Sequence, residues 1–156
     1  MKRNAWKIEG AYIPRRLEML QSPVWRGAPR ALKALLEELE IEHMRHRGTA
    51  NGSLFRSYRQ FVAAGFNRST VSAYTKMGEA LGLLKVNRES GFGPSRDLKE
   101  ACAYTLTYLP TGTGANIAPT DDWRRIKTEA QVLQIIQKFK PIKKEIRRIE
   151  IQEEAA

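Results

Sequence analysis

The chain has 156 residues, enough for one domain with a hydrophobic core and short arms. It is 42% hydrophobic and 28% charged, and no apolar run nears the roughly 18 residues of a membrane-spanning helix, which excludes an integral membrane protein. The N-terminus lacks the apolar stretch of a signal peptide, so we expect a cytoplasmic protein. A single cysteine, Cys102, excludes an internal disulfide and a cysteine-based metal site.

The charge balance indicates a polyanionic partner. Lys and Arg number 27 against 17 Asp and Glu, a net charge of +10, and proteins with such a balance most often bind nucleic acid. Residues 56–96 hold seven basic and two acidic residues, a net of +5. Half of the excess charge therefore lies in about a quarter of the chain.

The first 28 residues are predicted to form an N-terminal arm. We expect its apolar side chains to pack on the domain: Trp6, Ile8, Tyr12 and Ile13. A short helix is expected over residues 15–21, ending before Pro23.

A long helix is predicted from Pro29 to about Arg45. Proline suits the first helical turn, where its missing N–H has no partner to lose. Four leucines repeat at helical spacing: Leu32, Leu35, Leu36 and Leu39. Four glutamates lie in the same helix, so we expect it to lie away from phosphates. Residues 47–53 predict a loop.

Two further helices are predicted after a short strand at residues 54–55. Ser57 suits the N-cap of a helix over residues 58–64, which Gly65 ends in the left-handed conformation. Asn67 suits the N-cap of the next helix, over residues 68–81, and Gly82 ends it. The core face of that helix is expected to hold Val71, Tyr74, Gly78 and Leu81.

A hairpin follows, with strands at residues 83–87 and 101–110 and a basic, glycine-containing loop between them. Tyr104, Leu106 and Tyr108 share one face of the second strand. Residues 111–120 predict a linker, and residues 121–152 predict C-terminal helices that pack on the domain or dimerise. The first of these is expected to reach about residue 140, with an apolar stripe of Ile126, Ala130, Leu133 and either Ile136 or Gln137.

The order is helix, short strand, helix, tight turn, helix, strand, basic loop, strand. That is the order of a winged helix-turn-helix, in which the second helix of the pair enters the major groove of DNA. We therefore expect an α+β, mainly helical fold, with a winged helix-turn-helix domain over residues 29–110.

The stretch "NRSTVSAYTKMGEALGLLKV", residues 67–86, resembles the recognition helix and following strand of bacterial winged helix-turn-helix proteins. Similarity over residues 17–108 suggests the regulators found on plasmids, phages and other mobile elements. The resemblance implies that Gly65 is the turn glycine and Val71 the core anchor. It also implies that these residues face DNA: Asn67, Arg68, Ser69, Thr70, Ser72, Ala73 and Lys76. One departure is Gly78, where many relatives carry leucine, because glycine destabilises a helix by about 1 kcal/mol relative to alanine.

Further basic and polar residues are candidate DNA-backbone contacts. On the hairpin they are Lys85, Arg88, Ser90 and Arg96. On the first helix of the pair and just before it they are Arg59 and Arg56, because that helix often crosses the phosphates. For each of these residues the alternative is a solvated surface charge.

The sequence predicts neither an enzyme nor a bound cofactor. His43 and His46 are spaced for one helix face, but zinc needs further ligands and the nearby acids have no clear spacing. The glycine loops at residues 91–94 and 112–114 do not follow a strand and open a helix, as phosphate-binding loops do. No arrangement of nucleophile and base stands out.

The expectation is thus a bacterial, nucleoid-associated transcriptional regulator that binds double-stranded DNA and represses by occupying a promoter. A homodimer on a two-fold operator is expected, joined by the helices after residue 120 or the arm before Trp25. Two alternatives stay open. One is a replication or recombination accessory protein that binds iterated sites, and the other is a winged-helix module that binds proteins and does not read DNA.

Overall fold

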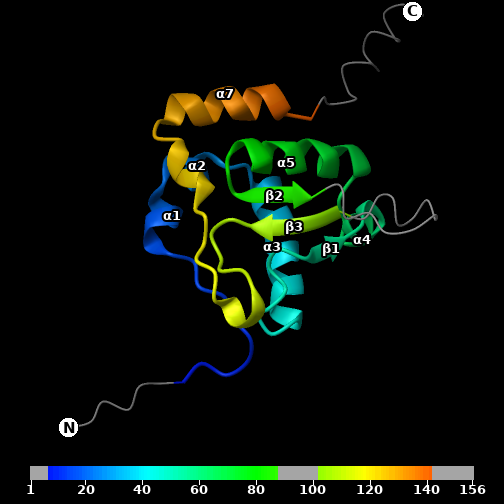
Figure 1. Ribbon diagram of the computed structural model, residues 1–156. Coiled ribbons are helices and arrows are strands. Elements are labelled where there is room, and N and C mark those ends of the chain that lie inside the picture. Colours follow the sequence, from blue (N-terminus) through cyan, green and yellow to red (C-terminus); the bar gives the residue numbers. More distant parts are fainter. Residues whose placement is uncertain (1–6, 88–101, 142–156) are drawn as a thin grey trace, which may run out of the picture.

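The computed structural model describes residues 7–87 and 102–141, which form an α+β fold (Figure 1). Three strands, β1 (Leu54–Arg56), β2 (Leu84–Asn87) and β3 (Cys102–Leu106), make an antiparallel sheet in the order β1-β3-β2. The helices within the described residues are α1 (Leu17–Gln21), α2 (Pro23–Gly27), α3 (Arg30–Arg45), α4 (Tyr58–Ala63), α5 (Arg68–Ala80) and α7 (Glu129–Phe139). Two short 3-10 helices, η1 (Thr113–Ala115) and η2 (Asp122–Arg125), lie between β3 and α7. None of the described helices has both the length and the apolar character that crossing a bilayer requires.

The N-terminal arm differs from expectation in two ways. One short helix was predicted before Pro23, but α1 and α2 follow each other directly, because Ser22 accepts a hydrogen bond from the Trp25 N–H and Pro23 begins α2. The prediction that Ile8 and Tyr12 pack on the domain is wrong, since their exposed fractions are 69% and 66%. Trp6 lies outside the described residues, and Ile13 packs against the core as predicted.

The predicted long helix is confirmed as α3, with Pro29 at the N-cap. All four leucines of its stripe are fully buried. One glutamate is buried with them: Glu40 is 2% exposed. It accepts hydrogen bonds from the Arg15 guanidinium and from the Tyr108 hydroxyl, the latter at 2.6 Å, so it ties the arm to the segment after β3.

The sheet places β3 in the middle. Tyr104 pairs with Leu54 of β1 on one side and with Val86 of β2 on the other. Its buried ring meets the Phe61 ring edge to face at 6.1 Å between centroids. Tyr104, Leu106 and Tyr108 are buried, but so are Thr107 and Leu109 of the predicted opposite face, because the chain leaves the strand after Leu106. The strand ends at Leu106 rather than near residue 110, because the chain turns there and the Thr107 hydroxyl donates to the Gly82 carbonyl at 2.5 Å.

The structure also corrects the prediction for the C-terminal segment. A continuous helix from residue 121 to about 140 was expected, but η2 ends at Arg125 and α7 begins at Glu129. Thr128 starts α7 with a capping box, in which its hydroxyl accepts from the Gln131 N–H at 3.2 Å. The break resets the helical phase, so Val132 is buried whereas Leu133, a predicted core residue, is 57% exposed.

One core joins the arm, the central segment and the C-terminal segment. The buried cluster contains Val24 and Trp25 of α2, Trp123 of η2 and Val132 of α7, together with the leucines of α3. Helix α7 packs on both α2 and α5 (Figure 1). The described part of the C-terminal segment therefore packs on the domain, and the residues predicted as a second C-terminal helix, 142–152, lie outside the described residues.

Candidate nucleic-acid interface

Helices α4 and α5 are joined by a tight turn with defined local chemistry. Ser57 begins α4 with a capping box: its hydroxyl accepts from the Gln60 N–H at 3.2 Å, and its own N–H donates to Gln60 Oε1 at 2.8 Å. Gly65 has φ +101°, as the sequence predicted, and this is a conformation that L-residues rarely adopt. The Phe66 N–H then donates to the Phe61 carbonyl at 3.1 Å, and the two rings meet edge to face. These contacts fix the direction in which α5 leaves the turn.

The inner face of α5 packs on the sheet and on α3. Val71, Met77 and Gly78 are buried there. Tyr74, predicted on this core face, is half-buried and packs against the core, and Thr75 is buried beside it. Asn67 occupies the predicted N-cap position, but its side chain makes no capping hydrogen bond.

Gly78, at the position where many proteins of the resembled family carry leucine, allows α5 to pack close to its neighbours. A Cβ built at this position would lie 2.9 Å from Leu84 Cδ2 and 3.2 Å from Leu32 Cδ1. Both leucines are fully or almost fully buried, so neither has open space into which to move. Glycine here brings α5 closer to β2 and α3 than a larger residue would allow.

The outer face of α5 carries a polar and basic stripe. Arg68, Ser69 and Lys76 are exposed, and Ser72 and Ala73 are half-buried. A helix turns by about 100° per residue, so these five residues fall within a sector about 140° wide. We call Arg68, Ser69, Ser72, Ala73 and Lys76 the α5 stripe.

Thr70 was predicted to face DNA with this set, but the helix geometry separates it. It is half-buried and lies about 60° beyond the edge of the α5 stripe. We therefore leave Thr70 out of the candidate interface.

Two elements border the α5 stripe. On one side, Glu79 lies within the sector of the α5 stripe, about 20° from its Arg68 edge, and its Oε1 accepts a hydrogen bond from the Val86 N–H of β2 at 3.3 Å, so the hairpin lies along that edge. At the N-terminal end, the Arg68 guanidinium lies 5.9 Å from the centroid of the Tyr58 ring of α4. This ring contact was missed in the sequence, since Tyr58 and Arg68 are ten positions apart and meet only across the turn.

Of the four candidate DNA-backbone contacts on the hairpin, only Lys85 lies within the described residues. Lys85 is exposed on β2, where its Nζ lies 3.4 Å from Asp122 Oδ2. The predicted backbone contacts Arg88, Ser90 and Arg96 lie outside the described residues.

Arg56 is a correction to the predicted interface. Its exposed fraction is only 8%, it forms an ion pair with Glu38 of α3, and its guanidinium lies 5.2 Å from the centroid of the Phe61 ring. The alternation of the short strand β1 turns Leu54 and Arg56 inward and Phe55 outward. Arg59, on the exposed side of α4, remains a candidate phosphate contact.

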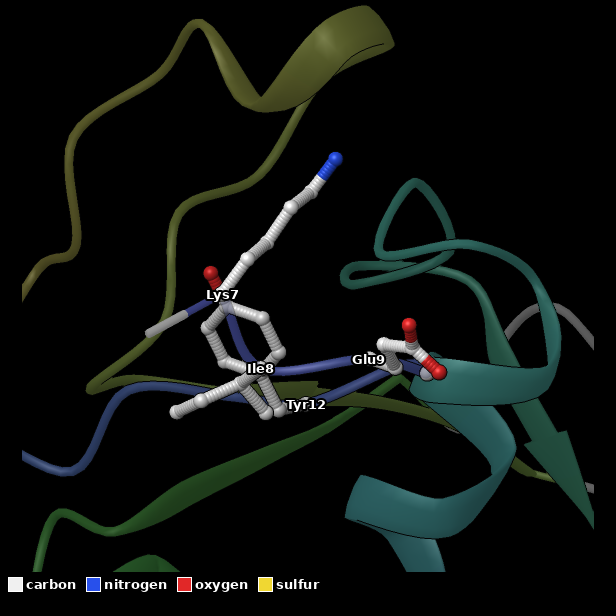
Figure 2. Close-up of a pocket in the computed structure, with 5 residues that line it drawn as sticks. Lys7, Ile8, Glu9 and Tyr12 are labelled. Carbon is white, nitrogen blue, oxygen red and sulfur yellow. The ribbon is translucent and has the colours of Figure 1, made fainter. Parts of the chain in front are cut away.

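Residues 7–87 and 102–141 hold no group of three or more side chains that could together bind a metal ion. Burial lowers the pKa of His43, so its imidazole is neutral at neutral pH, and His46 pairs with Glu42. The pocket drawn in Figure 2 is lined by Lys7, Ile8, Glu9, Gly10 and Tyr12, all of the arm, and it gathers no catalytic set.

Asp121 anchors the segment after β3, a role that the sequence did not predict. Asp121 adopts φ +49°, forms an ion pair with Arg16 of the arm, and accepts from the Trp123 indole N–H at 3.2 Å. Its neighbour Asp122 pairs with Lys85.

Comparison of the chain with protein families, with characterised proteins and with solved structures gives no match.

Proposed function

We propose that this protein is a winged helix-turn-helix transcriptional regulator that binds a specific sequence of double-stranded DNA and represses by occupying a promoter. The observation that carries the proposal is the α5 stripe: a polar and basic helix face, exposed after a tight turn, on a helix whose other side is built into the core. Solvated helix faces are common, but this one combines an arginine at its start, small polar residues in the middle and a lysine beyond them.

The dimensions and chemistry of the α5 stripe suit a major groove. A helix with its side chains is about 10–12 Å across, and the groove is about 12 Å wide. Arg68 would read guanine O6 and N7 from the N-terminal end, and the Tyr58 ring would hold its guanidinium in place beforehand. Ser69 and Ser72 would donate to bases or phosphates, Ala73 would contact a thymine methyl group, and Lys76 would neutralise a phosphate.

Backbone contacts would flank this readout. Arg59 on α4 and Lys85 on β2 are exposed beside α5 and would meet phosphates, with Lys85 leaving Asp122 to do so. We propose a homodimer on a two-fold operator, whose half-sites lie about 34 Å or a multiple apart.

The test is selection of binding sites from a random pool of double-stranded DNA at ~150 mM salt, a concentration at which nonspecific phosphate binding is weak. We expect one enriched motif, with two-fold symmetry if the protein binds as a dimer. Arg68→Ala should lose preference at one base position, whereas Arg45→Ala, at an exposed arginine of α3, should keep the motif.

Two outcomes would replace the proposal. Tandem direct repeats in the enriched DNA would favour a replication or recombination accessory protein. Absence of enrichment, with no salt-dependent DNA binding, would favour a protein-interaction module.

A further inference from the structure

Helix α7 packs on both α2 and α5 (Figure 1), and its contacts with α2 show which of its sides faces that helix. On the α2 side, Gly27 comes so close that a Cβ built on it would lie 2.6 Å from Val132 Cγ1 and 4.0 Å from Ile136 Cδ1. Further round the same side, Glu129 and Leu133 line a small pocket with Pro23 and Arg26 of α2. The α2 side of α7 is thus defined by residues 129, 132, 133 and 136.

The flank of α7 that points away from its α2 side is exposed. Gln131, Gln134 and Lys138 fall within a sector about 60° wide there, and none of the three is buried. We call these three residues the α7 outer flank. The only acidic residue of α7 is Glu129, on the α2 side, so the α7 outer flank is neutral or positive along its length.

The width of the major groove determines which part of the DNA the α7 outer flank would contact in a complex. Packed helices lie about 8–10 Å apart, and a groove about 12 Å wide admits one helix. If α5 fills the groove, as proposed above, a helix packed beside α5 must lie over the phosphates of the strand that borders the groove. The hairpin lies along one edge of the α5 stripe through the bond between Glu79 and Val86, and α7 also packs on α5, so we place α7 at the other edge.

We infer that α7 is a second DNA-binding element, and that Lys138 on the α7 outer flank binds a backbone phosphate beside the groove that α5 enters. The inference rests on the proposed function of the α5 stripe. The Lys138 ammonium lies 5.4 Å from the Phe139 ring centroid, which holds it at the end of the helix. A lysine in the last turn also stabilises the helix dipole, so the test measures DNA affinity separately from stability.

The experiment measures the dissociation constant for one DNA duplex between 50 and 200 mM salt, using the full chain and three variants. Lys138→Gln removes the inferred contact. Arg26→Gln removes the same charge from the α2 side of α7. The double variant Lys138→Gln with Leu133→Lys keeps the net charge but moves it to the α2 side, at a position already 57% exposed. Thermal unfolding confirms that each variant folds.

Each phosphate contact contributes about 0.9 to the slope of log affinity against log salt. We expect Lys138→Gln to flatten the slope by about 0.9, Arg26→Gln to leave it unchanged, and the double variant to stay as flat as Lys138→Gln. A wild-type slope in Lys138→Gln, or a slope restored by moving the charge, would overturn the inference while leaving the proposed function standing. If the wild-type protein itself shows no salt-dependent binding, the proposed function fails together with the inference.

Discussion

The fit of α5 against the sheet can be tested at Gly78, where two opposing effects are of similar size. Replacing glycine by alanine inside a helix stabilises it by about 1 kcal/mol. Here the added methyl group would lie 2.9 Å from Leu84 Cδ2 and 3.2 Å from Leu32 Cδ1, both on buried side chains. Overpacking of this kind destabilises by about 1–3 kcal/mol. We therefore expect Gly78→Ala to lower the free energy of unfolding by about 0–2 kcal/mol despite the gain in helix propensity.

The assay is urea unfolding followed by circular dichroism, with a double-mutant cycle at Leu84. Leu84→Ala removes the closer of the two clashing side chains and by itself destabilises by about 2–5 kcal/mol. In that background Gly78→Ala should become stabilising by about 1 kcal/mol, because propensity then prevails. If Gly78→Ala stabilises the wild-type chain by the same amount as in the Leu84→Ala background, the two sites are uncoupled. The close approach of α5 to β2 would then be refuted.

Three further predictions follow from the buried and interfacial polar residues. Glu40→Ala should lower the free energy of unfolding by about 2–4 kcal/mol in urea unfolding, because it leaves the buried Tyr108 hydroxyl without its acceptor and removes an ion pair. An unchanged free energy of unfolding would contradict a stabilising role for the hydrogen bonds of Glu40 with Arg15 and Tyr108. Burial lowers the pKa of His43 below 6.5, so the unfolded chain binds this proton first and stability should fall as the pH drops below about 6.5. His43→Gln should lose that part of the dependence between pH 7 and 5.5, and an identical pH profile would refute it. In DNA-binding titrations, Arg68→Ala should weaken binding to the selected site by about 1–3 kcal/mol and Thr70→Ala by less than about 0.5 kcal/mol, with equal losses contradicting the assigned stripe.

Local chemistry made much of the chain predictable. Ser57 caps α4 and Gly65 ends the turn in the left-handed region, as expected from residue type alone. The leucine stripe of α3 was also correct. In each case the determining interaction spans a few residues, so the pattern is complete within a short window of sequence.

Some errors arose where partners are distant in the sequence. Arg56 is drawn inward by Glu38, and Glu40 is buried because Arg15 and Tyr108 meet it from 25 and 68 residues away. The burial of Arg56 and Glu40 therefore depends on which segments meet in the core. The error in the phase of α7 is local: an apolar repeat runs through the break before Thr128 and hides the capping box that begins the helix.

The sequence alone therefore determined the basic charge, the helices and strands of the central segment, the tight turn and the polar residues that follow it. The tertiary structure decided which of those residues are exposed together. It withdrew Arg56 into an ion pair and set α7 beside α5. The physical reason is that capping and turn formation are local interactions, whereas burial and charge pairing depend on contacts between residues that only the folded chain brings together.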